Sequence, residues 1–210
     1  MRLIGRRSYH KNPRFCNWCM WLGRLYPGGT EIELSFLFAD VRGSTNLAET
    51  MSAAQFSHLM NRFYAAATDV LVRTDAFIDK LVGDEVIGLY IPGYAGRQHA
   101  RKAVHAAQEL GRAMGYGTPG GPWLPIGIGV HTGVAYVGTV QGIEGAVTDF
   151  TALGENVNIT ARLVSNADPG EALISDAAYA AADLNLGDLE RRELDLKGKA
   201  EPVSVRVLGL

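Results

Sequence analysis

The chain has 210 residues, of which 47% are hydrophobic and 20% charged, a balance typical of a globular protein and not of a disordered one. No apolar run approaches the ~18 residues that a membrane-spanning helix needs. The first residues, MRLIGRRSYHKN, lack the apolar core of a signal peptide. We therefore expect a cytoplasmic protein without a membrane span. Two cysteines in a chain of this length exclude a disulfide framework.

Basic and acidic side chains are unevenly distributed. Residues 1–30 contain six Lys or Arg and no acid, whereas the remainder contains 14 basic and 22 acidic side chains. The composition changes at the Pro-Gly-Gly of YPGGTE, so we divide the chain into a basic N-terminal extension, residues 1–29, and one domain, residues 30–210. The extension is either a solvated or self-docked arm, or a surface for an acidic partner, a lipid surface or nucleic acid. The acidic domain argues against nucleic acid.

The extension carries a single C-x-x-C pair, Cys16 and Cys19. One such pair supplies half of a tetrahedral zinc site, and His10 or the extension of a second copy would have to complete it. Redox sensing and plain reduced thiols are the alternatives that the sequence leaves open.

The first part of the domain predicts a strand followed by a long helix. ELSFLFADV, residues 33–41, is an apolar run of strand length that ends beside Asp40. Apolar residues then recur with helical spacing from residue 46 to about residue 73. Ser44 or Thr45 is positioned to cap this helix.

The middle of the chain predicts two hairpins and a helix. FIDKLVGDEVIGLYIPG, residues 77–93, has the pattern of two strands joined at Gly83–Asp84. A helix follows from about residue 96 to residue 114. PIGIGVHTGVAYVGTVQG, residues 125–142, predicts a second hairpin that turns near His131–Thr132–Gly133. We interpret His131 as a structural residue.

The last part predicts a helix at ENVNITARLVSNAD, a strand at ALIS, a helix at DAAYAAADL, and two strands, ERRELDL and PVSVRVLGL, around a KGKAEP turn. Because hairpins outnumber crossovers, the expected class is an α+β sandwich with a largely antiparallel sheet.

Two aspartates stand where apolar strands end, Asp40 after the first strand and Asp84 at the tip of the hairpin. Carboxylates in apolar surroundings are costly unless they are paired or bound to metal. Two of them on adjacent strands can hold two divalent cations, Mg²⁺ or Mn²⁺, which clamp the oxygens of a phosphoryl-type displacement. The alternative is a pair of unrelated turn aspartates.

Two further patterns point to a nucleotide. Residues 41–45, VRGST, lead from Asp40 into a helix N-terminus, where free N–H groups and the helix dipole favour a phosphate. Asn158 and Arg162 are four residues apart on a predicted helix and share one face. An Arg there can stabilise charge on a phosphate and an Asn can orient a ribose, although this pair alone is also typical of a solvated face.

FADVRGST, DKLVGDE, GVHTG, DFTALGENVNITAR and LKGKAEPV, in this order and spacing, resemble the class III nucleotidyl cyclase catalytic domain. The resemblance covers about residues 31–210. It implies a ferredoxin-like antiparallel sheet sandwich with helices on one face. It also implies an enzyme that cyclises a nucleoside triphosphate with two divalent cations, Mg²⁺ or Mn²⁺.

The resemblance implies the metal and phosphate contacts. Asp40 and Asp84 match the metal-binding aspartates, and Val41 would add a backbone carbonyl. Lys197 matches a lysine that contacts the terminal phosphates; VQGIEGAVT lacks the arginine that some members carry for phosphate, which leaves Arg42 as a further candidate. The helix N-terminus described above adds Val41, Gly43, Ser44 and Thr45 of the first loop as expected substrate contacts.

The resemblance also implies the base and transition-state residues. Lys80 and Thr151 match the purine-selecting pair, Asn158 the ribose-orienting residue and Arg162 the transition-state residue. Lys80 donates, which suits adenine N1, and the Thr151 hydroxyl can accept from the adenine N6 amine, so we expect ATP as substrate. Guanylate cyclase and a catalytically silent nucleotide-binding module are the alternatives. We assign Asp149 a turn or salt-bridge role.

Residues four apart on an extended strand are separated by ~13 Å, which is too far for Lys80 and Asp84 to serve one base and one metal pair with ease. The resemblance implies that metal residues come from one protomer and purine and transition-state residues from the other. We therefore expect a homodimer with two equivalent shared sites.

Overall fold

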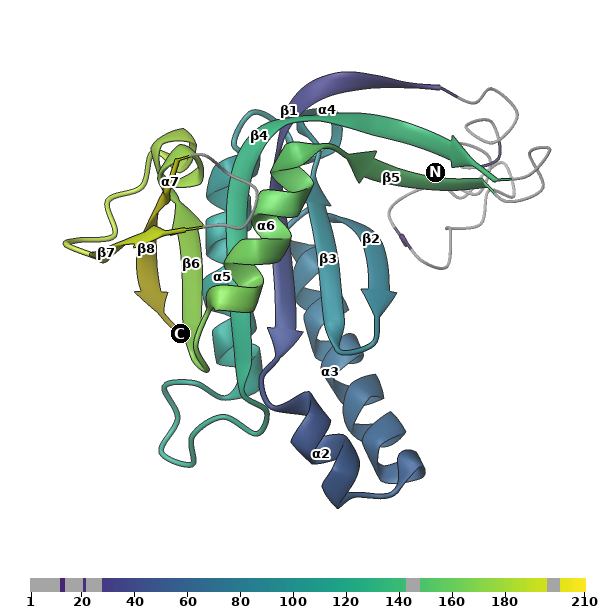
Figure 1. Ribbon diagram of the computed structural model, residues 1–210, viewed down its shortest axis with the longest axis vertical. Coiled ribbons are helices and arrows are strands. Elements are labelled where there is room, and N and C mark those ends of the chain that lie inside the picture. Colours follow the sequence, from purple (N-terminus) through teal and green to yellow (C-terminus); the bar gives the residue numbers. More distant parts are fainter. Residues whose placement is uncertain (1–11, 14–20, 22–27, 143–147, 196–200) are drawn as a thin grey trace.

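The computed structural model describes residues 12–13, 21, 28–142, 148–195 and 201–210. They form an eight-stranded sheet in the order β2-β3-β1-β4-β6-β8-β7, with β5 paired to β4 outside this path (Figure 1). The strands are β1 (Gly29–Val41), β2 (Phe77–Val82), β3 (Glu85–Tyr90), β4 (Ile126–Gln141), β5 (Thr148–Leu153), β6 (Glu171–Ser175), β7 (Glu190–Leu194) and β8 (Val203–Gly209). The helices are α2 (Ser44–Thr50), α3 (Ala53–Arg73), α4 (Pro92–Ala95), α5 (His99–Met114), α6 (Glu155–Asn166) and α7 (Asp176–Ala182).

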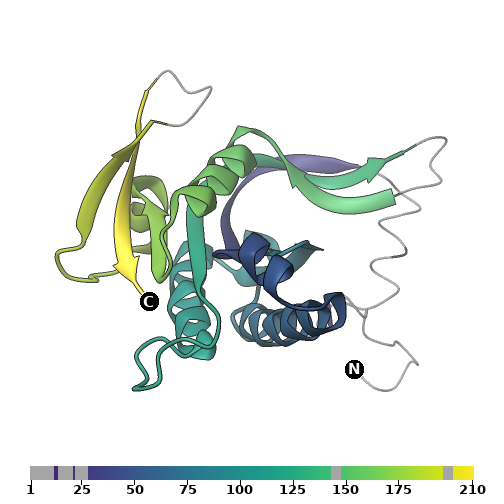
Figure 2. The ribbon, with the colours of Figure 1, turned by 60° about the horizontal axis from the view of Figure 1, so that its bottom comes forward.

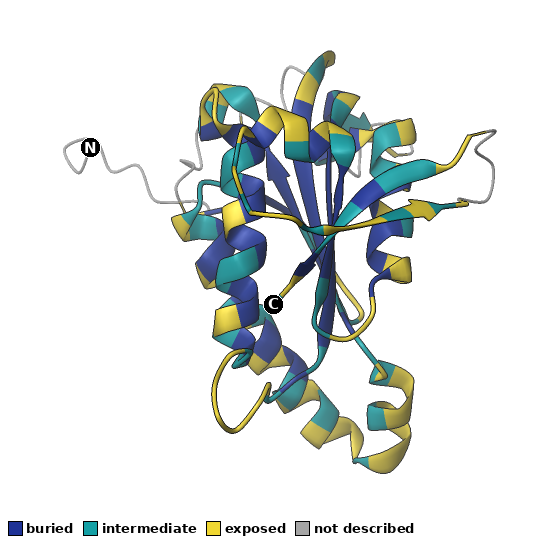
Figure 3. Cartoon of the chain, turned by 90° about the vertical axis from the view of Figure 1, so that its left-hand side faces the viewer, coloured by how far each residue is buried: buried dark blue, intermediate teal, exposed yellow. Residues whose placement is uncertain are grey.

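The sheet lies between two unequal helical layers. Helices α3, α5 and α7 cover one face, where they bury the main hydrophobic core, and α6 lies on the opposite face (Figure 2). Figure 3 shows the central strands as the most buried part of the chain. The predicted α+β class is confirmed. The expected arrangement of helices on one face applies to the three helices of the main core, while α6 is alone on the other face.

Most strand pairs are antiparallel, as expected, and β4–β6 is parallel. The predicted hairpin β2–β3 is confirmed, with its turn at Gly83–Asp84. β6, α7, β7 and β8 also form where the sequence predicted them, and β7 pairs with β8. The turn between these last strands falls largely on residues 196–200, outside the described residues.

The helix predicted from residue 46 to 73 is interrupted. Met51 is extended, so α2 ends before it, and Ser52 starts α3 with a capping box in which its hydroxyl accepts from the N–H of Gln55 and the Gln55 side chain accepts from the N–H of Ser52. The prediction that Ser44 or Thr45 caps the first helix is wrong. The cap position of α2 is Gly43, whose φ of 71° is a left-handed conformation that glycine adopts without steric cost.

The predicted hairpin turning near His131–Gly133 is also wrong, because residues 126–141 form one continuous strand, β4. The glycines that suggested a turn instead allow helix α6 to lie close to strand β4. A Cβ at Gly129 would be 2.6 Å from the Val164 nitrogen, and one at Gly133 would be 2.5 Å from Cγ of Asn156, both on α6. The chain instead reverses between β4 and β5, which pair antiparallel.

Part of the N-terminal extension contacts the edge of the sheet. Asn12 is buried, and its side-chain amide donates to the carbonyl of Ile78 at 3.0 Å and accepts from the N–H of Ile78 at 2.7 Å. Cys16, Cys19 and His10 lie outside the described residues. None of the described helices is both long and apolar enough to cross a bilayer.

Candidate active site

The two predicted metal-binding carboxylates lie together at one end of the sheet. Asp40 is next to the last residue of β1, in register with Glu85, the first residue of β3. Asp84 occupies the turn before Glu85, and its carbonyl accepts from the N–H of Val41 at 3.1 Å. On α3, Tyr64 donates its hydroxyl to the carbonyl of Gly83 and so supports the turn. Directly opposed residues of an antiparallel pair project from the same face, so Asp40 and Glu85 are neighbours.

The carboxyl groups of this end repel one another. The pKa of Asp40 is raised to about 6, first by burial and then by Asp84, against the opposing effect of Arg42. The pKa of Glu85 is raised to about 7, first by burial and then by Asp40 and Asp84. We call Asp40, Arg42, Asp84 and Glu85 the carboxylate cluster. Sequence reasoning missed Glu85, although its position in the hairpin, facing Asp40, was the available signal.

Arg42 is the counter-charge of this cluster. Its guanidinium forms an ion pair with Asp40 and its Nη1 lies 3.5 Å from the carbonyl of Ala167. Its Nε is buried without a hydrogen-bond partner, the one such side-chain atom among the described residues. Arg42 is therefore engaged with Asp40, which does not favour the role in phosphate binding considered for it.

The cluster fits divalent cations that bind together with a nucleotide. In the described part of the chain, no three His, Cys, Asp or Glu side chains are arranged as a complete metal site. Mg²⁺ usually takes only one or two carboxylates and completes its shell with water and substrate phosphates. Asp40 and Asp84 can provide such a pair of oxygen ligands. Burial, and after it the neighbouring carboxylates, raise the pKa values of Asp40 and Glu85, and a bound cation would offset both effects.

The loop after β1 is open to solvent beside this cluster. Gly43 and Thr45 are exposed and Ser44 is half-buried at the first position of α2, whereas Val41 is buried. The loop thus presents backbone next to Asp40, as a phosphate contact would require. Lys197, the other candidate for phosphate binding, lies outside the described residues.

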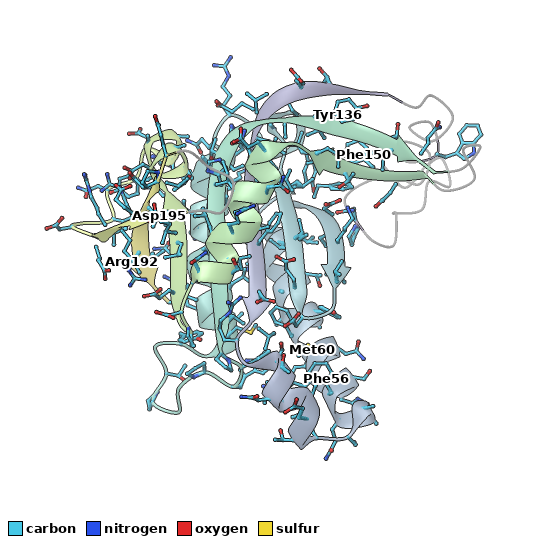
Figure 4. The ribbon with its side chains drawn as sticks, viewed as in Figure 1. Phe56, Met60, Tyr136, Phe150, Arg192 and Asp195 are labelled. Atoms are coloured by element: carbon cyan, nitrogen blue, oxygen red, sulfur yellow. The ribbon has the colours of Figure 1, made fainter. Side chains whose placement is uncertain are left out.

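The predicted base-selecting pair is also formed within one chain. Lys80, on β2, donates from Nζ to Oγ1 of Thr151, on β5, at 2.8 Å. Strand β5 is held over β2 by an edge-to-face contact between Phe77 and Phe150, whose ring centroids are 5.1 Å apart. Figure 4 shows Phe150 on β5.

Two carboxylates adjoin this pair, and sequence reasoning assigned neither to the site. Asp79 is only 4% exposed; its Oδ2 accepts from Oγ1 of Thr151 at 3.0 Å and lies 3.3 Å from Nζ of Lys80. Asp149 forms a longer ion pair with Lys80, at 3.7 Å, which confirms the salt-bridge role expected for it. We call Asp79, Lys80, Asp149 and Thr151 the base cluster.

Asn158 and Arg162 lie one turn apart on α6, as predicted, with Asn158 exposed and Arg162 half-buried. Among the described residues, neither side chain forms a hydrogen bond or ion pair with the carboxylate cluster or the base cluster. Both side chains are therefore available to contact a ligand on the face of the sheet opposite the main core.

His131 fixes the start of α6. His131 Nε2 pairs with Oδ1 of Asn156 at 2.8 Å, and Asn156 donates from Nδ2 to the carbonyl of Val134 at 2.7 Å. The other ring nitrogen of His131 pairs with Ser175 at 2.7 Å. These contacts confirm that His131 is structural.

The sheet order, the helix that lies alone on one face and the paired carboxylates define a nucleotidyl cyclase domain. Residues 30–208 match the family model described as the adenylate and guanylate cyclase catalytic domain, and the chain belongs to this family.

Two curated relatives are adenylate cyclases. The chain is 32% identical over 139 residues to an adenylate cyclase of Anabaena cylindrica, covering 62% of this chain and 26% of the relative. It is 27% identical over 180 residues to the terminal-differentiation specific adenylate cyclase of Dictyostelium discoideum, covering 82% of this chain and 8% of the relative. The chain thus spans about a quarter or less of the length of these two relatives.

Solved structures agree in fold. The structure of the guanylyl cyclase Cya2 matches with a TM-score of 0.78 and 26% identity, covering 87% of this chain and 95% of that one. The adenylyl cyclase CyaB from P. aeruginosa matches with a TM-score of 0.72 and 27% identity, covering 87% of this chain and 97% of that one.

Proposed function

We propose that this protein is an adenylate cyclase that converts ATP to 3′,5′-cyclic AMP and pyrophosphate. The observation that carries the proposal is the 2.8 Å contact between Lys80 and Thr151, which places a cationic donor beside a hydroxyl oxygen. Adenine presents an acceptor at N1 and a donor at N6, which complement these two groups. Guanine presents N1–H and O6, so its N1–H would face the Lys80 ammonium, donor against donor. Because the substrate is ATP, the proposal includes a cytoplasmic location.

The carboxylate cluster supports the chemistry. Asp40, Asp84 and the Val41 carbonyl would hold two divalent cations, Mg²⁺ or Mn²⁺, which when bound supply Lewis-acid charge at the ribose 3′-oxygen and the triphosphate. The backbone of residues 43–45 and the side chain of Lys197 would bind the phosphates. Arg162 would stabilise charge that develops on the α-phosphate as the 3′-oxygen attacks and pyrophosphate leaves, and Asn158 would orient the ribose.

The proposal includes a homodimer with two shared sites. Lys80 is turned toward Thr151 and Asp149, while Asn158 and Arg162 are not engaged with either cluster of their own chain. Four apolar side chains on β2, β4 and β5 are 41–56% exposed: Leu81, Val82, Val134 and Leu153. A second protomer would cover such residues in the proposed dimer.

Product analysis tests the reaction. Purified protein is incubated with Mg²⁺ or Mn²⁺ and, in parallel, ATP and GTP, with Asp40→Ala as the matched inactive control. We expect cyclic AMP from ATP, and none from the variant. The structural likeness to the guanylyl cyclase Cya2 makes GTP the necessary second substrate, and cyclic GMP as the main product would replace our proposal by a guanylate cyclase. No cyclic product from either nucleotide would point to a silent nucleotide-binding module.

Mixing two inactive variants tests the shared sites. Asp84→Ala removes a metal ligand and Arg162→Ala removes the transition-state residue, so each homodimer should be inactive. In a mixed dimer one site would combine the intact residues of both chains, and activity should return. Failure of the mixture to recover activity, with mixed dimers demonstrated by tagged copies, would contradict a shared site.

A further inference from the structure

Asp79 is a buried carboxylate beside the proposed adenine-binding pair. It is 4% exposed, and two donors converge on it, the Thr151 hydroxyl at 3.0 Å and the Lys80 ammonium at 3.3 Å. Burying a carboxylate is costly unless it is paired and hydrogen-bonded, and these two donors satisfy that requirement. The next question is what a buried carboxylate does chemically beside the Lys80–Thr151 pair.

A threonine hydroxyl is by itself a poor discriminator between purines. It carries one proton and two lone pairs, so it can accept from the 6-amino group of adenine or, after rotation, donate to the 6-oxo group of guanine. An ionised carboxylate, in contrast, only accepts. When the Thr151 proton is directed to Asp79, the Thr151 oxygen can serve the base only as an acceptor.

We propose that Asp79 is a specificity-determining residue, which fixes the Thr151 hydroxyl as an acceptor and thereby selects a 6-amino purine over a 6-oxo purine. Asp79 is a positioning residue, since it acts through Thr151 and Lys80 and does not itself contact the base. The inference rests on the proposed adenylate cyclase function and names the group that sets its substrate preference.

An irregularity in β2 makes this geometry possible. Ile78 is in register with Gly88, but Lys80 is in register with Ile87, so Asp79 is the extra residue of a β-bulge. In a regular strand consecutive side chains project to opposite faces, and Asp79 and Lys80 would not both reach Thr151. Bulges re-aim side chains and are enriched next to active sites. The bulge therefore supports a functional role for both residues.

The test uses triphosphates that differ at position 6 of the purine. ATP carries an amine there, purine riboside triphosphate carries only hydrogen, and ITP carries an oxo group. Cyclic product formation gives kcat/KM for each in wild type and Asp79→Asn, whose amide can either donate to or accept from Thr151. We expect the wild-type preference for ATP over purine riboside triphosphate to fall about tenfold in the variant, the size of one hydrogen bond. The use of ITP relative to ATP should rise.

Two further variants control the comparison. Asp69→Asn removes an exposed carboxylate of α3 that pairs with Arg73 and lies outside both clusters, and it should leave the preference for the 6-amino group unchanged. Thr151→Val removes the hydroxyl and should lower the preference as Asp79→Asn does. Adding Asp79→Asn to Thr151→Val should then change the preference no further, because both act through the same hydrogen bond.

Equal losses with ATP, purine riboside triphosphate and ITP in Asp79→Asn would overturn the inference and leave Asp79 a merely structural group. Should Asp79→Asn not fold, as judged by circular dichroism, Asp79→Ser provides the same test with a smaller side chain. A wild-type protein without cyclase activity would count against the proposed function alone. The dissociation constants of ATP and purine riboside triphosphate, measured by calorimetry in both proteins, would then decide the role of Asp79.

Discussion

The carboxylate cluster and the base cluster both combine acidic and basic side chains, but their balance differs. In the carboxylate cluster three acids surround one guanidinium, and the pKa values of Asp40 and Glu85 are raised to about 6 and about 7. In the base cluster the Lys80 ammonium lies between Asp79 and Asp149, and the Thr151 hydroxyl bridges Lys80 and Asp79 at 2.8 and 3.0 Å.

The difference indicates how each cluster would meet its ligand. Burial and mutual repulsion disfavour the ionised acids of the carboxylate cluster, so this cluster would contribute to cation binding at the expense of stability in the metal-free protein. The base cluster has its donors and acceptors already oriented, so in the proposed function it would discriminate between bases with little rearrangement.

The largest effect is expected for Asp84→Asn. The substitution keeps the size of the side chain but removes the charge of a proposed metal ligand, and we expect a fall in kcat/KM of about a thousandfold, equivalent to several kcal/mol of transition-state stabilisation. Cyclic AMP formation at saturating Mn²⁺ provides the measurement. Asp69→Asn, on the exposed face of α3, is the matched control and should retain activity; equal activity of both variants would remove Asp84 from the metal site.

Gly129→Ala should affect α6 while leaving both clusters in place. Its Cβ would be 2.6 Å from the nitrogen of Val164 and 2.9 Å from the carbonyl oxygen of Thr160, so the helix must shift. We expect the free energy of unfolding to fall by about 2 kcal/mol and kcat to fall about a hundredfold, because Arg162 is displaced while the base cluster still binds ATP. A fall in ATP affinity with unchanged kcat would contradict this division of roles.

The control for Gly129→Ala is Gly93→Ala, where an added Cβ would meet no atom within 4 Å. It should leave both the free energy of unfolding and kcat unchanged. Urea unfolding and initial-rate measurements on the two variants provide the comparison.

Asn12→Ala tests whether the contact between the N-terminal extension and β2 stabilises the domain. The variant leaves the buried N–H and carbonyl of Ile78 without the Asn12 amide, immediately before the bulge at Asp79. We expect the free energy of unfolding to fall by about 2 kcal/mol. Asn61→Ala, on the exposed surface of α3, is the control. An unchanged denaturation midpoint for Asn12→Ala would show that the contact with Ile78 does not stabilise the domain.

The smallest effect is expected for Glu85→Gln. Because the pKa of Glu85 in the folded protein, about 7, exceeds its usual value of 4.5, the folded state binds the proton more tightly. The stability of the metal-free protein should therefore fall as pH rises from about 4.5 through 7. Glu85→Gln should reduce this fall and stabilise the protein at pH 8 by about 1 kcal/mol, a modest value because solvent screens a half-buried group.

Thermal unfolding in EDTA at pH 5 and pH 8 measures this effect, and about 3 °C is the expected rise in Tm at pH 8. Glu49→Gln, on α2 and exposed, is the control. A lower Tm for Glu85→Gln than for wild type at pH 8 would mean that Glu85 is stabilised by a partner and does not suffer net repulsion.

Short local patterns in the sequence were enough to predict some of the helices and strands. The hairpin of residues 77–90 was predicted from apolar runs flanking Gly83–Asp84, and α6 was predicted at ENVNITARLVSNAD. The sequence was also sufficient to indicate the cyclase family, because five short motifs occur in one order and spacing. Asp40 and Asp84 were therefore correctly expected to lie together.

The tertiary structure decided what depends on pairing between distant segments. Glycines 129 and 133 suggested a turn, but they allow α6 to pack against one continuous strand. The bulge that turns Asp79 toward Thr151 depends on the register between β2 and β3 and on β5 folding over β2. Strand periodicity, which alternates faces, would have placed Asp79 and Lys80 on opposite sides. Strand register and the close packing of a helix on a strand depend on contacts across the whole domain. A local sequence pattern therefore does not predict them.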